Sequence, residues 1–233
     1  MILPLRLSQV TYRDIIQPLS LEIDAGPSTI ILGANGAGKS VLMRLMHGLL
    51  APTSGRIAWR EADPPRVRRL QAMVFQRPVM LRRSVLGNVI YALKVAGIPA
   101  GERHRMAFQA LLEVGLSHLA HRPARVLSGG EQQRLALARA WALHPEVIFL
   151  DEPTASLDPT ATREIEAVIR AFDAAGTKVV MATHNLGQAR RLGDEVIYLH
   201  QGRVLERTPA DRFFTQPATA QAAAFIKGEL PWL

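Results

Sequence analysis

A glycine-rich loop constrains this chain more than any other feature of its sequence. Residues 33–40 read Gly-Ala-Asn-Gly-Ala-Gly-Lys-Ser, which fits the pattern G-x-x-x-x-G-K-[S/T]. The loop follows an apolar, β-branched run at 28–32, predicted as a buried strand, and opens a stretch with helical spacing at 39–50. Free backbone N–H groups at such a helix start attract phosphate. The sequence therefore predicts a phosphate-binding loop and an α/β fold that can hold it.

The residues of the loop suit a nucleoside triphosphate with magnesium. Gly36 and Gly38 let the backbone bend so that its N–H groups converge on phosphate oxygens. Lys39 supplies positive charge for the β- and γ-phosphates, and the Ser40 hydroxyl suits Mg²⁺, which prefers hard oxygen ligands. The alternative is a glycine turn that precedes Lys-Ser by chance. It would not account for the strand predicted just before the loop and the helix predicted just after it. We expect ATP to be bound by Gly33, Ala34, Asn35, Gly36, Ala37, Gly38, Lys39, Ser40 and Val41.

A carboxylate pair follows the continuous apolar run at 147–150, which is predicted as a central parallel strand. Open α/β sheets bind ligands at the carboxyl ends of their strands, where Asp151 and Glu152 would lie. Asp151 is expected to hold Mg²⁺, directly or through water. Glu152 is expected to accept a proton from the water that attacks the γ-phosphate. The alternative is a pair of carboxylates that merely face solvent at a strand end.

A second glycine turn, Leu-Ser-Gly-Gly-Glu at 127–131, also opens a predicted helix. Ser128 can cap that helix and Glu131 completes a capping box, so a purely structural role is one interpretation. Two adjacent glycines, Gly129 and Gly130, exceed what a cap needs. They expose further backbone N–H groups at a helix start, which makes this turn a second candidate anion site.

Strands that alternate with helices predict a sheet covered on both faces. The pattern from 84 to 143 is helical almost throughout, which indicates a subdomain inserted into the sheet. The predicted strands are 5–12, 28–32, 56–59, 72–75, 147–150, 178–182, 195–199 and 203–206, the last two as a possible hairpin. The predicted helices are 39–50, 84–95, 102–114, 131–143, 160–175 and 186–192.

Composition excludes several classes of protein. There is no cysteine, so a disulfide framework and cysteine metal sites are excluded. We expect no signal peptide, and no segment approaches the roughly 20 apolar residues that span a bilayer. The net charge is +8, but the basic residues are scattered in small clusters, as on solvated faces, without a block of five like charges. We therefore expect no nucleic acid as a partner.

Together these motifs resemble the nucleotide-binding subunit of an ATP-binding cassette (ABC) transporter. In the order of that family, the chain has a Walker A loop (GANGAGKS), a Q-loop glutamine (Gln76), a signature (LSGGE), a Walker B strand (VIFLDE), a D-loop (SLD, with Asp158) and a switch histidine (His184). The resemblance implies one ABC ATPase domain over 1–233. Its fold would be a P-loop NTPase, with a RecA-like mixed-sheet core, an α-helical subdomain inserted at about 77–145, and a small N-terminal antiparallel β subdomain.

The resemblance also implies roles for residues that are unremarkable when taken alone. Tyr12 would stack on adenine, and Gln76 would contact Mg²⁺ and the attacking water. His184 would contact the γ-phosphate and hold Glu152 in place. Val41 departs from the family, which usually has a threonine there whose hydroxyl reaches the α-phosphate.

The same resemblance implies a function for the second glycine turn. Ser128, Gly129, Gly130 and Glu131 would complete the ATP site of a second copy of the chain. Two copies would pack head to tail with two ATP between them, and Asp158 would lie at their seam.

The transport pathway would be a separate integral membrane permease, served indirectly by a solute-binding protein, with this subunit peripheral on the cytoplasmic face of the plasma membrane. We expect residues 78–95 to receive the permease, and Arg82 and Arg83 to face anionic lipid. We expect no C-terminal regulatory domain like that of the maltose importer ATPases.

The transported solute can be inferred only from sequence resemblance, because the ATPase subunit of a transporter does not contact it. Segments 75–85, 183–185 and 202–203 resemble tungstate importer ATPases and, less closely, phosphate importer ATPases. We therefore expect oxyanion import, with tungstate ahead of molybdate and phosphate.

Four alternatives remain at this point. An exporter subunit has the same motifs. A DNA-maintenance ATPase would need a long coiled coil between Gln76 and Ser128, which are too close for one. A non-hydrolysing ATP switch often lacks a carboxylate at the position of Glu152. A ribosome-acting protein would need two cassettes in one chain.

Overall fold

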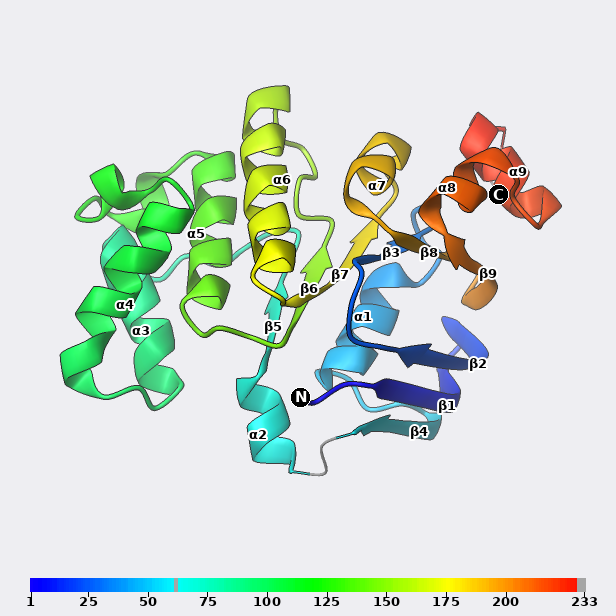
Figure 1. Cartoon of the computed structure of the whole chain (residues 1–233), viewed down its shortest axis with the longest axis horizontal. Helices are drawn as coiled ribbons and strands as arrows, with labels where there is room; N and C mark the ends of the chain where they lie inside the picture. The colour runs from blue at the N-terminus through cyan, green and yellow to red at the C-terminus, as the bar shows by residue number, and fades with distance from the viewer. Residues whose placement is uncertain (61–62, 230–233) are drawn as a thin grey trace.

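The structure, a computed structural model, describes residues 1–60 and 63–229. In this part of the chain the strands form a six-stranded sheet and a three-stranded sheet, which lie on opposite sides of α1 (Lys39–His47) (Figure 1). Helices cover the other face of the larger sheet. The expected α/β architecture, with a mixed main sheet and a small antiparallel N-terminal sheet, is confirmed.

The six-stranded sheet has the order β5-β6-β7-β3-β8-β9 and is parallel except for β9, which runs antiparallel to β8. Its strands are β3 (Thr29–Leu32), β5 (Gln71–Val74), β6 (Val147–Asp151), β7 (Lys178–Thr183), β8 (Glu195–His200) and β9 (Arg203–Pro209). Its central strands are apolar at consecutive positions because both faces are buried. In β6, Val147 and Phe149 pack toward α1, whereas Ile148 and Leu150 pack toward the helices of the opposite face.

The three-stranded sheet has the order β2-β1-β4 and is antiparallel. It comprises β1 (Leu5–Tyr12), β2 (Ile16–Ile23) and β4 (Ser54–Trp59). Its buried face shares one core with α1 and with the α1-facing side of the larger sheet. The strand β2, which contains Pro18, was not predicted. Its alternation of buried and exposed positions breaks between Ile16 and Leu19, where the pairing with β1 shifts register. A proline is tolerated here because β2 lies at the edge of its sheet.

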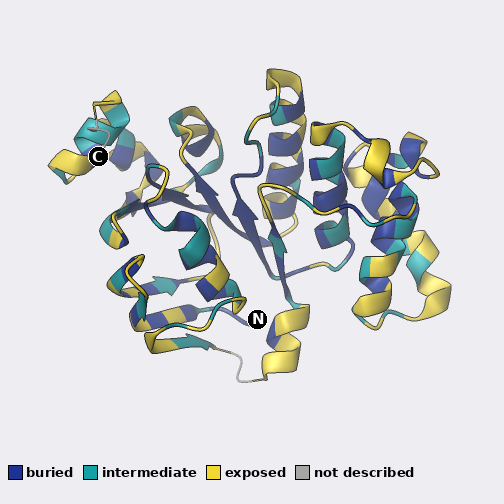
Figure 2. Ribbon diagram, turned by 180° about the vertical axis from the view of Figure 1, so that it is seen from behind, coloured by how far each residue is buried: buried dark blue, intermediate teal, exposed yellow. Residues whose placement is uncertain are grey.

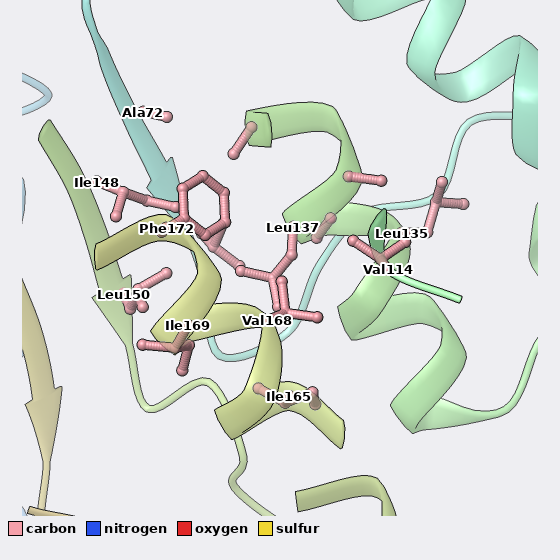
Figure 3. Packing of buried hydrophobic residues seen from close by; sticks show 14 of the residues in the cluster. Ala72, Val114, Leu135, Leu137, Ile148, Leu150, Ile165, Val168, Ile169 and Phe172 are labelled. Atoms are coloured by element: carbon pink, nitrogen blue, oxygen red, sulfur yellow. The ribbon is translucent and has the colours of Figure 1, made fainter. Parts of the chain in front are cut away.

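The opposite face of the large sheet is covered by α5 (Gly129–Trp141), α6 (Pro159–Ala174), α7 (Leu186–Leu192), α8 (Ala210–Thr215) and α9 (Ala220–Lys227). Figure 3 shows the packing of α6 between the sheet and α5, where Phe172 and Ile169 point toward β6 and Val168 points toward Leu137. Burying an aromatic or aliphatic side chain of this kind stabilises the fold by roughly 1.5–3 kcal/mol.

Between β5 and β6 the chain leaves the sheet and forms α3 (Val85–Val95), α4 (Ala100–Glu113), two short 3-10 turns (Ser117–Leu119 and Ala124–Val126) and α5. These helices form one end of the molecule, and much of the outer surface of α3 and α4 is exposed (Figure 2). Among the described residues, no helix has the length and apolarity needed to cross a membrane.

Element ends differ from the predictions by at most three residues, a difference reached at the carboxyl ends of β9 and of the helix α1. This helix ends at His47 rather than at residue 50, because Gly48 adopts φ 82 and closes the last turn. The structure also contains α2 (Pro64–Arg69), α8 and α9, which were not predicted.

Candidate active site

The glycine-rich loop joins the carboxyl end of β3 to the start of α1, as expected. Gly36 and Gly38 have φ of 83 and 101, values that favour glycine. Gly33 has no room for a side chain, since a Cβ there would lie 2.2 Å from the carbonyl oxygen of Leu199. The loop is therefore a close-fitting backbone turn whose geometry depends on its glycines.

The Lys39 side chain is folded back over the loop. Its Nζ donates to the carbonyl oxygens of Gly33 at 2.8 Å and Ala34 at 3.1 Å, and lies 3.4 Å from Oε1 of Glu152. Only 6% of Lys39 is exposed. Burial lowers the pKa of Lys39, and the attraction of Glu152 opposes that shift. Lys39 is thus a buried ammonium group held among oxygen atoms at the place where phosphate would lie.

Ser40 and Asp151 form the second contact of the site. The Ser40 hydroxyl donates to Oδ1 of Asp151 at 2.7 Å, across 111 positions of sequence. Burial raises the pKa of Asp151, which the Ser40 hydrogen bond partly offsets. Two hard oxygen donors therefore meet beside the loop, which is the donor set that Mg²⁺ prefers when phosphates and water supply its other ligands.

Glu152 lies between Lys39 and His184. Its Oε1 is 2.9 Å from Nδ1 of His184, and its Oε2 accepts a hydrogen bond from the Thr183 hydroxyl at 3.5 Å. The backbone of Glu152 has φ 48, a strained conformation for this residue type, and its N–H donates to the carbonyl of Ala182 at 2.9 Å. The Glu152 carboxylate is therefore held between the side chains of Lys39 and His184.

Gln76 lies at the same edge of the sheet. It follows β5, whose Val74 is paired with Leu150 of β6, so Gln76 and Glu152 each come two residues after paired positions. The Gln76 side chain is exposed. The adjacent carbonyl of Phe75 accepts a hydrogen bond from Nε2 of Gln133 at 3.3 Å, which links this segment to α5.

A clamp of backbone hydrogen bonds, which the sequence did not indicate, fixes the loop from outside. Gly202 lies in the β8–β9 turn, and its N–H donates to the carbonyl oxygen of Ala37 at 3.0 Å. The carbonyl oxygen of Gly202 accepts from the N–H of Gln17 at 3.1 Å. A Cβ on Gly38 would lie 3.4 Å from the carbonyl oxygen of Ile15, so the β1–β2 turn also packs against the glycine-rich loop. Tyr12 lies at the end of β1 beside this turn, partly exposed, with the guanidinium of Arg13 5.2 Å from its ring centroid.

We expect Gly202→Ala to weaken ATP binding without any contact to ATP. The new Cβ would lie 2.1 Å from the carbonyl oxygen of Ile15, on a residue with φ 73, so the clamp must shift. The backbone strain costs of order 1–3 kcal/mol. Gly176→Ala is the control, because Gly176 has φ 83 but open space around its Cβ. Thermal unfolding and nucleotide titration check both variants, and equal ATP affinities for the two would contradict a role for the clamp.

Val41 is partly buried and packs against the core beneath the small sheet. Threonine has nearly the same shape and adds a hydroxyl at the position where a further phosphate contact is expected. One such hydrogen bond is worth about 0.5–1.5 kcal/mol. Val41→Thr should therefore tighten ATP binding several-fold in a calorimetric titration, with Val41→Ala as the control for lost packing. An unchanged or weaker affinity of Val41→Thr would contradict this.

The second glycine turn lies apart from the glycine-rich loop. Ser128 caps α5 and forms a complete capping box with Glu131. The turn lines a hollow of about 340 Å³ together with Ser156, Leu157 and Asp158, and none of the lining residues comes from the glycine-rich loop. Asp158 itself caps α6 by accepting from the N–H groups of Thr160 and Ala161, which lower its pKa. The structure thus brings the 128–131 turn and Asp158 together, and keeps both apart from Lys39 within one chain.

The two glycines of this turn differ in a way that the sequence alone did not show. A Cβ on Gly130 would lie 2.7 Å from the Cβ of Ala161, so Gly130 permits close packing of α5 on α6. A Cβ on Gly129 would meet only Leu157, at an ordinary contact distance of 3.4 Å. The α5–α6 packing therefore accounts for one glycine and leaves Gly129 without a structural requirement.

The chain is similar to known proteins over most of its length. Residues 16–155 match the family model described as ABC transporter. The chain is 38% identical to the phosphate import ATP-binding protein PstB 2 of Natronomonas pharaonis, covering 93% of this chain and 82% of that protein. It is 39% identical to the tungstate uptake system ATP-binding protein TupC of Peptoclostridium acidaminophilum, covering 84% and 90%.

A relative named for a different solute is similar to the same degree. The methionine import ATP-binding protein MetN of Leifsonia xyli is 38% identical, covering 89% of this chain and 64% of that protein. Among solved structures, cbiO1 from Clostridium perfringens, described as part of the ABC transporter complex cbiONQ, superposes with a TM-score of 0.82 at 28% identity, covering 96% of this chain and 95% of that one.

Proposed function

The chain belongs to the ABC transporter family, and we propose that its ATP hydrolysis powers solute import through a separate membrane permease. The observation that carries the proposal is the convergence of three contacts at one sheet edge. Lys39 lies over the glycine-rich loop, Ser40 bonds to Asp151, and Glu152 lies between Lys39 and His184.

The proposed chemistry begins with an exchange of partners at Lys39. In the structure its ammonium is shared by Glu152 and two loop carbonyls. A triphosphate on the loop draws this charge to its β- and γ-oxygens, which frees Glu152 to act on water. Glu152 then accepts the proton of the attacking water, and His184 holds the carboxylate and contacts the γ-phosphate.

The residues beside the loop fit magnesium. Ser40 and Asp151 provide hard oxygen donors whose atoms are already 2.7 Å apart, and Gln76 extends the set from the neighbouring strand. When bound, the metal ion neutralises negative charge on the phosphate oxygens. Gly33 to Val41 would surround the phosphates, and Tyr12 would stack on the adenine.

The position of the second glycine turn supports a two-chain site. Ser128 to Glu131 and Asp158 share a hollow that contains no residue of the glycine-rich loop. We propose that this surface closes over the ATP of a second copy, arranged head to tail with two ATP between the copies. We also propose that residues of about 77–145 form a helical subdomain, whose 78–95 segment receives the permease at the cytoplasmic face of the membrane.

For the solute we propose an oxyanion, with tungstate ahead of molybdate and phosphate. Two of the relatives reported above are named for phosphate and tungstate, which are both tetrahedral oxyanions, and this supports the proposal. The test is the ATPase rate of the chain reconstituted with its permease and solute-binding protein in vesicles. Tungstate should stimulate hydrolysis most. Stimulation by methionine or glutamine, with none by any oxyanion, would reject the oxyanion and leave the ATPase assignment in place.

A further inference from the structure

The basic residues are scattered along the chain, but most of the net positive charge arises in one segment, because acidic residues are scarce there. Residues 77–127 contain seven arginines and one lysine against two glutamates, a net of +6 out of the +8 of the whole chain. This segment supplies α3, α4 and the 3-10 turns that precede α5. Its exposed outer surface lies at the end of the molecule away from the small sheet (Figures 1 and 2).

Within this segment, four basic side chains gather around one open hollow. It measures about 510 Å³ and is lined by Arg82, Arg83, Ser84, His121, Pro123 and Arg125, which we call the basic hollow. Its basic residues are exposed, and its lining includes no carboxylate. None of its residues belongs to the ATP site described above, and Arg82, Arg83 and Ser84 lie in the 78–95 segment that we propose receives the permease.

The two chain segments that form the hollow are held together by backbone contacts. Ser84 and Pro123 form an isolated antiparallel bridge. The N–H of Val85 donates to the carbonyl of Arg122 at 2.9 Å, and the N–H of Ala124 donates to the carbonyl of Arg83 at 3.0 Å. The Arg82–Arg83 and Arg125 positions are thus fixed side by side although they are about forty positions apart in sequence.

The arginines lack acidic partners. Within residues 1–60 and 63–229, Arg82, Arg125 and His121 form no ion pair, and Arg83 lies over the ring of Tyr91 with 5.1 Å between its guanidinium carbon and the ring centroid. The two glutamates of the segment do not line the hollow. Like charges held close together without a counter-charge repel one another, and a bound anion relieves that repulsion.

We propose that the basic hollow binds a tetrahedral phosphate-class oxyanion. Guanidinium groups match such oxyanions because each presents paired N–H donors in a planar fork. Arg82 and Arg125, from the two clamped segments, would hold oxygens from opposite sides, with Arg83 adding charge. The hollow is larger than one oxyanion and is open, so it admits either a free oxyanion or the phosphate of a lipid headgroup.

The test is anion binding by the full-length chain carrying Lys39→Ala, which removes the lysine of the glycine-rich loop as a competing anion site. One arm titrates inorganic phosphate and tungstate by calorimetry at constant ionic strength. The other arm measures sedimentation with vesicles of phosphatidylglycerol and phosphatidylcholine, compared with phosphatidylcholine alone. Circular dichroism checks the fold of each variant.

The charge-matched comparison decides the outcome. We expect Arg82→Ala/Arg125→Ala to weaken binding at least about tenfold. Lys94→Ala/Arg105→Ala removes the same charge from exposed positions outside the hollow and should change binding by less than about threefold. Arg82→Lys/Arg125→Lys keeps the charge and should be intermediate. Binding in the first arm assigns a free oxyanion, and binding in the vesicle arm alone assigns a headgroup.

Two results would overturn the proposal. Equal losses in the two double alanine variants would show a diffuse electrostatic effect rather than a site. Absence of binding to every probe by the parent chain would also reject it. Neither measurement involves ATP hydrolysis, so failure here leaves the proposed ATPase mechanism untouched.

Discussion

Replacing Glu152 with glutamine is expected to lower ATP hydrolysis by about 10²–10⁴-fold, the contribution typical of a positioned general base. The amide keeps the shape of the side chain and its place beside His184, but it cannot accept the proton of the attacking water. ATP binding should be unchanged or tighter, because Lys39 loses the carboxylate that lies 3.4 Å from its Nζ. Steady-state phosphate release and nucleotide titration separate the two effects.

The control for Glu152 is Glu113→Gln. Glu113 is exposed on α4, and among residues 1–60 and 63–229 its carboxylate accepts a hydrogen bond only from the side chain of Gln109, so its replacement should leave hydrolysis near the parental rate. If Glu152→Gln also retained most of its hydrolysis, the base would have to be another group, and the proposed role of Glu152 would be wrong.

Gly129→Asp is expected to abolish most hydrolysis without harming ATP binding by the single chain. Gly129 is exposed, has ordinary backbone conformation, and its Cβ position is open apart from Leu157 at 3.4 Å. An aspartate at the first turn of α5 is also favoured by the helix dipole, so the fold should persist. In a head-to-tail pair, however, its charge would face the γ-phosphate. Like charges across an interface cost several kcal/mol, so the rate should fall at least about 10²-fold.

Gly129→Ala serves as the matched control, because it fills the same space without charge and should remain substantially active. Binding is measured by calorimetry and hydrolysis by phosphate release. If Gly129→Asp hydrolysed ATP at the parental rate, the turn would act only as a helix cap and the two-chain site would be refuted.

The parts of the site that are local in sequence could be predicted well. The glycine-rich loop has its strand and helix on either side, and the Ser128–Glu131 capping box spans four residues. The apolar run before Asp151 could belong only to a buried element. In these places the hydrogen-bonding and backbone requirements are met within one short segment, so residue types alone reveal them.

The remaining features depend on contacts between distant segments. The Gly202 clamp on Ala37 joins two turns about 165 positions apart, and the need for glycine at 130 arises from Ala161 on another helix. The strained backbone of Glu152 and its shared contact with Lys39 also require the assembled sheet. Sequence patterns carry no signal for such contacts, because the partners are brought together only by the fold.

In the proposed mechanism, two chains close on ATP before Glu152 acts. The most direct measurement is the mass of the Glu152→Gln chain by light scattering during size-exclusion chromatography with Mg²⁺ and ATP. We expect twice the 25.6 kDa of one chain with one ATP bound per chain, and a return to single-chain mass when Gly129→Asp is added. A species of 25.6 kDa with ATP bound, at every chain concentration tested, would contradict it.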